Sequence, residues 1–131
     1  MKKIIKTFLL ISVLTFSACS AVKFFHSDDS GKYVLGSDDI PLFSGLEFIA
    51  DDSTSFDTMS GNIVVSDYLG EVKSKKVEKF YAKTLPQLGW KLISKQDDKV
   101  LYKRDVDKLE ITFKQNGESL NVRFFISSIT K

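Results

Sequence analysis

Few side chains in this chain of 131 residues could act as a catalytic base, a nucleophile or a soft metal ligand. There is one histidine, His26, and one cysteine, Cys19. A hydrolase of the Ser-His-Asp type needs a histidine beside its nucleophile, and a zinc site needs several Cys and His ligands. His26 lies in a polar stretch that we expect to be outside the folded part. The sequence therefore predicts no catalytic residue, no metal site and no cofactor.

Carboxylates are the remaining candidates for chemistry. Asp67 and Glu71 could form the acid and base pair of a glycan-cleaving enzyme, but carboxylates on strands are usually structural. Four pairs of adjacent aspartates could suggest calcium binding: Asp28-Asp29, Asp38-Asp39, Asp51-Asp52 and Asp97-Asp98. None of them has the spaced oxygen ligands of a calcium-binding loop. We expect solvated turns at these pairs, and no enzyme.

Cys19 itself belongs to a different pattern. Three lysines at positions 2, 3 and 6 precede an apolar run at 8–16, and Ser17-Ala18-Cys19 closes it. This segment resembles the lipobox of bacterial lipoproteins. The resemblance implies that the Cys19 sulfur carries a diacylglycerol, that the chain is cut before it, and that the membrane is a partner through this anchor. An ordinary secretory signal and an uncleaved anchor stay open, although a membrane span needs roughly 20 apolar residues.

Removal of this leader changes the charge balance. The whole chain carries a formal charge of +2, which becomes about −1 without the three leader lysines, so the basic pI does not indicate a nucleic-acid partner. With a single cysteine, no intramolecular disulfide can form, and lipidation would remove an exposed thiol. The remaining length suits one domain of modest size.

The order of the mature chain is a tether followed by a domain. Residues 19–39 are polar and rich in turn residues, which predicts a flexible lipid-anchored tether. Residues 40–131 should form the domain, with an irregular cover at 40–57 that ends in a short strand. A longer strand at 63–72 follows, and Gly70 could mark a bulge in it.

A helix is predicted at 74–88. Ser74 offers an N-cap, Gly89 suits the left-handed position after the last turn, and Pro86 should cause a kink or an early end. One face is apolar through residues spaced by three and four positions, namely Val77, Phe80, Tyr81, Leu85 and Leu88. The lysines on another face of this helix are expected to be exposed to solvent.

Strands are predicted after the helix at 90–95, 100–104, 109–114 and 120–126. Asn116-Gly117 fits the tip of a type I′ hairpin between the last two. This tip would place Phe113 opposite Leu120 and, on the other face, Glu110 opposite Arg123. The expected fold is α+β, a two-layer sandwich of about five antiparallel strands with one helix on one face.

Several segments, Ser55-Phe56-Asp57-Thr58, Gly61-Asn62-Ile63-Val64, Phe80-Tyr81 and Thr84 to Trp90, resemble a group of small uncharacterised alphaproteobacterial envelope proteins. The resemblance covers roughly residues 40–125 and implies the same helix-on-sheet domain. It implies no activity and transfers no functional residue.

The function predicted from these patterns is a lipid-anchored envelope protein that binds another envelope protein. Phe125 and Leu101 are the partner-binding candidates, because strand alternation turns them to the face away from the helix. The alternative is a binder of a small apolar or lipid ligand near Phe80, Tyr81 and Trp90, between helix and sheet. The resemblance to bacterial lipoproteins implies, through Ser20 after the lipidated cysteine, the outer membrane, facing the periplasm, although sorting to the inner membrane stays open.

Overall fold

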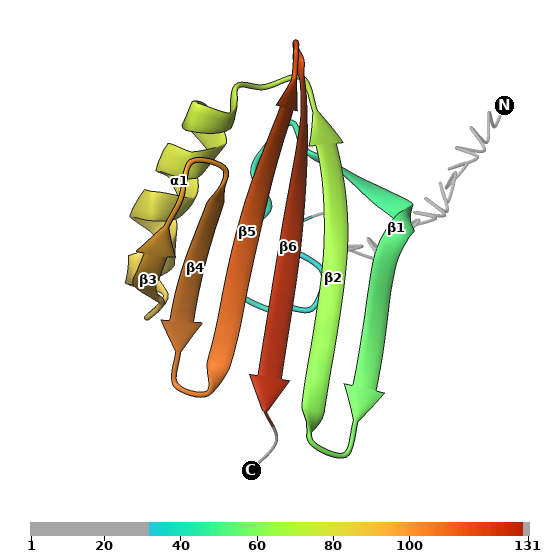
Figure 1. The fold of residues 1–131 in the computed structure, drawn as a ribbon, viewed down its shortest axis with the longest axis vertical. Coiled ribbons are helices and arrows are strands. Elements are labelled where there is room, and N and C mark those ends of the chain that lie inside the picture. Colours follow the sequence, from blue (N-terminus) through green and yellow to red (C-terminus); the bar gives the residue numbers. More distant parts are fainter. Residues whose placement is uncertain (1–31, 130–131) are drawn as a thin grey trace, which may run out of the picture.

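Six strands and one helix make up the part of the chain that the computed structural model describes, residues 32–129. In chain order the elements are β1 (Glu47–Thr58), β2 (Gly61–Gly70), α1 (Ser74–Gln87), β3 (Lys91–Lys95), β4 (Lys99–Arg104), β5 (Asp107–Asn116) and β6 (Ser119–Ile129). All strands pair antiparallel in the order β1-β2-β6-β5-β4-β3 (Figure 1). The α+β class and the helix on one face are confirmed, and the sheet has six strands rather than about five.

The sheet is wider than expected because residues predicted as an irregular cover form most of an edge strand. β1 begins at Glu47 and pairs with β2, with a register shift between Ile49 and Thr54. Gly70, predicted to mark a bulge, instead pairs in register with Leu120. A Cβ at Gly70 would lie 2.3 Å from the Gly45 carbonyl oxygen, so close backbone approach explains this glycine.

The helix forms where its apolar spacing predicted. Val77, Tyr81 and Leu85 are buried against the sheet, and each side chain of this size contributes about 1.5–3 kcal/mol when fully buried. Ser74 is the first helical residue rather than the cap, and its amide donates to Gln115 Oε1 of β5 at 2.9 Å. Gly89 adopts a φ of +85° after the helix, as expected, and Pro86 falls in the last turn.

The hairpin between β5 and β6 has a different register from the predicted one. Asn116 pairs with Ser119, so Gly117 and Glu118 form the tip. Gly117 has a φ of +60° and occupies the first central position, where a type II′ turn takes glycine. Every cross-strand partner therefore moves by two residues: Phe113 pairs with Val122, and Glu110 lies opposite Phe125 instead of Arg123.

A shift of two residues leaves each side chain on its predicted face. The inner face of the central strands is buried towards α1. It carries Leu109, Ile111, Phe113, Leu120, Val122, Phe124 and Ile126.

The N-terminal segment, residues 32–46, covers the part of the inner face that α1 leaves open. Val34 and Ile40 are buried in the core. The Leu35 amide donates to the Tyr68 hydroxyl at 2.9 Å, which ties this segment to β2. Residues 32–39 were predicted to be tether, and they pack on the domain because Val34 gives them an apolar anchor. Figure 1 shows this segment and α1 on the same side of the sheet.

Candidate protein-interaction surface

The outer face of the sheet is the face opposite α1. Among residues 32–129, no helix or loop forms a layer over it (Figure 1). Val65 of β2 lies directly opposite Phe125 of β6, and Phe56 of β1 lies opposite Ile63 of β2. We call these four side chains the outer-face patch. Phe56 is 57% exposed, while Ile63, Val65 and Phe125 are partly exposed.

Leu101 and Phe125, the two predicted partner-binding residues, both lie on this face. Phe125 belongs to the outer-face patch, whereas Leu101 of β4 is separated from it by Glu110 of β5, which lies opposite both residues. Lys99 forms an ion pair with Glu110 at 3.1 Å. The structure therefore joins Phe125 to Val65 rather than to Leu101.

Ile63 and Val65 were missed because the sequence predicted the strand at 63–72 without its neighbours in the sheet. The alternation of side chains along the strand could have identified these two residues. Once Val64, Ser66 and Tyr68 point inwards, the odd-numbered residues between them must point outwards. Phe56 was missed because only a short strand was predicted around it, at the end of an irregular cover.

An ion pair with a buried carboxylate lies beside the outer-face patch. Asp67 of β2 is opposite Arg123 of β6, and the arginine Nε lies 3.0 Å from both carboxylate oxygens. The Asp67 side chain is 1% exposed and that of Arg123 is 53% exposed. The Asp67 amide also donates to Ser53 Oγ, whose hydroxyl donates to the Ile49 carbonyl. The irregular part of β1 thus folds over the carboxylate, which the guanidinium neutralises.

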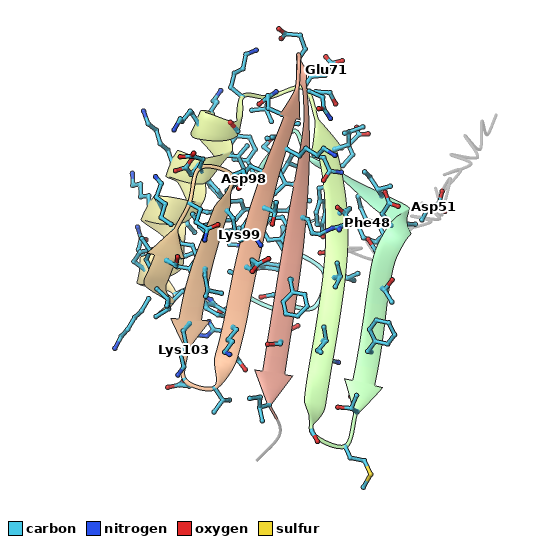
Figure 2. The ribbon with its side chains drawn as sticks, viewed as in Figure 1. Phe48, Asp51, Glu71, Asp98, Lys99 and Lys103 are labelled. Atoms are coloured by element: carbon cyan, nitrogen blue, oxygen red, sulfur yellow. The ribbon has the colours of Figure 1, made fainter. Side chains whose placement is uncertain are left out.

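This arrangement does not suit the glycan-cleaving pair considered from the sequence. Asp67 is enclosed and paired with Arg123, whereas Glu71 is exposed just past the end of β2 (Figure 2). A carboxylate that is enclosed and held by an arginine is not open to a substrate, so Asp67 and Glu71 do not form such a pair.

A second polar cluster holds the N-terminal segment to the far end of the helix. The Arg104 guanidinium carbon lies 4.4 Å from the centroid of the Trp90 ring. Its Nη1 donates to Asp39 and to the Leu88 carbonyl, the latter at 3.1 Å. Partial burial raises the pKa of Asp39, but hydrogen bonds from Arg104 and Ser37 and the arginine charge outweigh it, so the pKa is lowered.

Trp90 lies beneath this cluster and is 2% exposed. Its indole Nε1–H has no hydrogen-bond partner among the described residues. A pocket of about 390 Å³ borders Trp90, Arg104 and Asp39. Its lining does not include Phe80 or Tyr81.

Phe80 and Tyr81 instead pack towards the N-terminal segment. The Tyr81 hydroxyl donates to the Pro41 carbonyl at 3.0 Å and accepts from the Phe43 amide at 3.1 Å. The Phe80 ring meets the Phe43 ring edge to face, with centroids 5.3 Å apart. Burial raises the pKa of Tyr81 far above its ordinary value. Phe80 and Tyr81 thus pack on the N-terminal segment, whereas the pocket described above borders Trp90.

Other predictions lie outside the described residues: Cys19, the leader, and residues 19–31 of the tether. Within residues 32–129, no helix is both long and apolar enough to cross a membrane. The same part of the chain contains no group of three His, Cys, Asp or Glu side chains placed to hold a metal ion.

The chain matches no protein-family model, no curated protein and no solved structure. The resemblances to bacterial lipoproteins and to small alphaproteobacterial envelope proteins therefore stay predictions.

Proposed function

We propose that this protein is a lipid-anchored, non-enzymatic binding module of the bacterial cell envelope, and that it holds another envelope protein against the outer face of its sheet. The outer-face patch carries this proposal. Phe56, Ile63, Val65 and Phe125 present contiguous apolar surface on a face without a covering layer among the described residues. Removing such surface from water gains about 25 cal/mol per Å², which a docked partner would realise.

Arg123 gives this surface a polar rim. Its guanidinium is held in place by Asp67 and remains half exposed, so its free N–H groups can donate to a partner without a large loss of side-chain entropy. Aromatic residues and arginine are enriched in protein interfaces. A fixed arginine at the rim of an apolar patch that contains Phe125 and Val65 is a composition typical of a docking site.

The anchor is the second half of the proposal, and the lipobox resemblance of Ser17-Ala18-Cys19 supports it. A lipid on Cys19 would hold the domain at the membrane, and Ser20 favours the outer membrane, facing the periplasm. Metabolic labelling with a palmitate analogue tests this part. Label should enter the wild type and be absent from Cys19→Ser, and membrane fractions should retain only the wild type. Equal labelling of both proteins, or none of either, would contradict the anchor.

Binding is tested by co-purification after cross-linking in cells. The double variant Val65→Thr with Phe125→Ser should lose its captured partner, since the substitutions remove the apolar centre but keep a strand-compatible residue at 65. Leu101→Ser should have a smaller effect because Glu110 separates it from the patch. Met59→Ser is the control, as Met59 is fully exposed at the β1–β2 turn. Capture that is equal in all four proteins would refute the proposed surface.

The alternative, an apolar ligand between helix and sheet, has less support. Tyr81 contacts Phe124 of the sheet with ring centroids 5.4 Å apart, and both residues are fully buried. Side chains therefore already fill the space between the layers at this point.

A further inference from the structure

Both edges of the sheet are open in the described part of the chain, residues 32–129. β1 and β3 are the outermost strands, and each pairs with one neighbour only. An unpaired edge presents backbone N–H and C=O groups that can add another strand.

Exposed apolar side chains gather at these two edges. Of the nine large apolar side chains that are exposed among the described residues, two lie on β1 and two on β3. They are Phe48 and Phe56 on β1, and Leu92 and Ile93 on β3. In natural proteins, charged residues, proline or a covering element usually protect edge strands from pairing with another chain.

The two edges carry opposite charge. From Glu47 to Gly70, which spans β1 and β2, there are five acidic residues and no lysine or arginine. β3 carries Lys91 and Lys95 and no acidic residue, and the neighbouring β4 carries Lys99, Lys103 and Arg104. Figure 2 shows Asp51 at the β1 side of the sheet and Lys103 at the opposite side.

We propose that copies of this chain associate head to tail, with the acidic edge β1 of one copy against the basic edge β3 of the next. Charge selects this pairing, because β1 against β1 would oppose acidic residues and β3 against β3 would oppose lysines. A contact between two different edges is not closed by a two-fold axis. It extends into a row of copies or closes as a ring.

The two edges offer stretches of similar length, although the one in β3 is interrupted by a register shift. In β1 the stretch from Thr54 to Thr58 pairs with β2 without a register shift, and β3 is five residues long with one shift between Leu92 and Ser94. The new ladder is therefore limited to about five residues, too short for a tight complex without the apolar and charged side chains beside it.

Disulfide trapping in the full chain tests the contact. Thr54 of β1 and Ser94 of β3 are exposed and lie on the outer face of the sheet, opposite Val65 and Leu101 respectively. Five strand spacings place the two edges about 24 Å apart within one copy. A disulfide needs Cα atoms within about 7 Å, so Thr54→Cys and Ser94→Cys in one chain can bridge only between copies. The double variant should give a ladder of linked species. Each single variant controls for Cys19 and for same-edge contacts, and should give none.

Charge reversal supplies the second readout. Asp51→Lys, Asp52→Lys and Asp57→Lys together leave β1 with three lysines and one glutamate, which makes both edges basic. Lys91→Glu with Lys103→Glu makes both edges acidic, because the remaining basic residues of β3 and β4 are each paired with an acidic residue. All five substituted residues are exposed and none forms an ion pair among residues 32–129. Placed on the double-cysteine chain, either reversal alone should abolish the ladder, and an equimolar mixture of the two should restore it.

Circular dichroism first establishes that each variant is folded. Absence of a ladder from the unreversed double-cysteine chain would overturn the proposal, as would failure of the mixture to restore it. Linking of a single-cysteine variant to a different protein, without a ladder, would assign the edge to another partner and also overturn it.

Discussion

Val65 and Phe125 lie opposite each other on neighbouring strands, on the face of the sheet away from the helix. Phe124, the residue before Phe125 in the chain, points the other way and is fully buried. One strand therefore places one phenylalanine in the core and one at the surface. The outer-face patch depends on this alternation.

Substitutions of Phe124 and of Phe125 should therefore change the stability by different amounts. Phe124→Ala leaves a cavity in the core and should lower the free energy of unfolding by about 3–5 kcal/mol. Phe125→Ala should cost about 1 kcal/mol, because it loses mainly a cross-strand contact with Val65. Urea unfolding of the two variants measures the difference. Similar losses for both would contradict the assignment of the two faces.

Arg104 should control the environment of Trp90. In the wild type the indole is buried beneath the guanidinium, so its fluorescence should be blue-shifted. Arg104→Ala removes the cation–π contact and the hydrogen bonds to Asp39 and Leu88. It should shift the emission to longer wavelength and lower stability by about 1–3 kcal/mol. Lys103→Ala on the opposite sheet face is the matched control. An unchanged emission in Arg104→Ala would contradict the contact.

Asp39 should make the attachment of the N-terminal segment sensitive to acid. Its pKa is lowered from the ordinary value of 3.8 in the folded protein, so ionised Asp39 stabilises the fold above that value. The stabilisation should be lost as the pH falls through the lower folded pKa.

The comparison with Asp39→Asn measures this effect. At neutral pH the wild type should unfold at higher urea concentration than the variant, and the difference should shrink as the pH falls below about 4. A difference that grows on acidification would have the wrong sign.

Tyr81 should hold the N-terminal segment through its hydroxyl. Tyr81→Phe leaves the Pro41 carbonyl and the Phe43 amide without their partner, at a cost of about 1–3 kcal/mol. Amide hydrogen exchange at Phe43 should accelerate. Tyr102→Phe is the control, since Tyr102 is also buried and its hydroxyl makes no hydrogen bond within residues 32–129. Equal effects of the two substitutions would refute the role of Tyr81.

Local patterns predicted the helix and the direction of side chains on the central strands. The apolar spacing from Val77 to Leu85 and the left-handed Gly89 are properties of a few neighbouring residues. The hairpin register could not be decided this way. Moving the tip from Asn116-Gly117 to Gly117-Glu118 shifts the pairing between β5 and β6 by two residues. Such a shift keeps every side chain on the same face of the sheet.

Contacts between distant residues could not be predicted from the sequence. β1 lacks clear alternation because of its register shift, so its first half looked irregular. Asp39 and Arg104 are 65 residues apart, and their pairing depends on the whole fold. The side chains of the outer-face patch belong to three different strands. Of the four residues in the patch, the sequence pattern identified only Phe125.

The most direct test of the proposed function is photo-cross-linking from defined positions in cells. A photoreactive amino acid replaces Ile63, within the outer-face patch, or Lys75, on the exposed side of α1. A discrete adduct with one envelope protein should form from position 63, disappear when Phe125→Ser is added, and be absent from position 75. Equal adducts from both positions, or an adduct at 63 that persists with Phe125→Ser, would contradict the outer face as the docking surface.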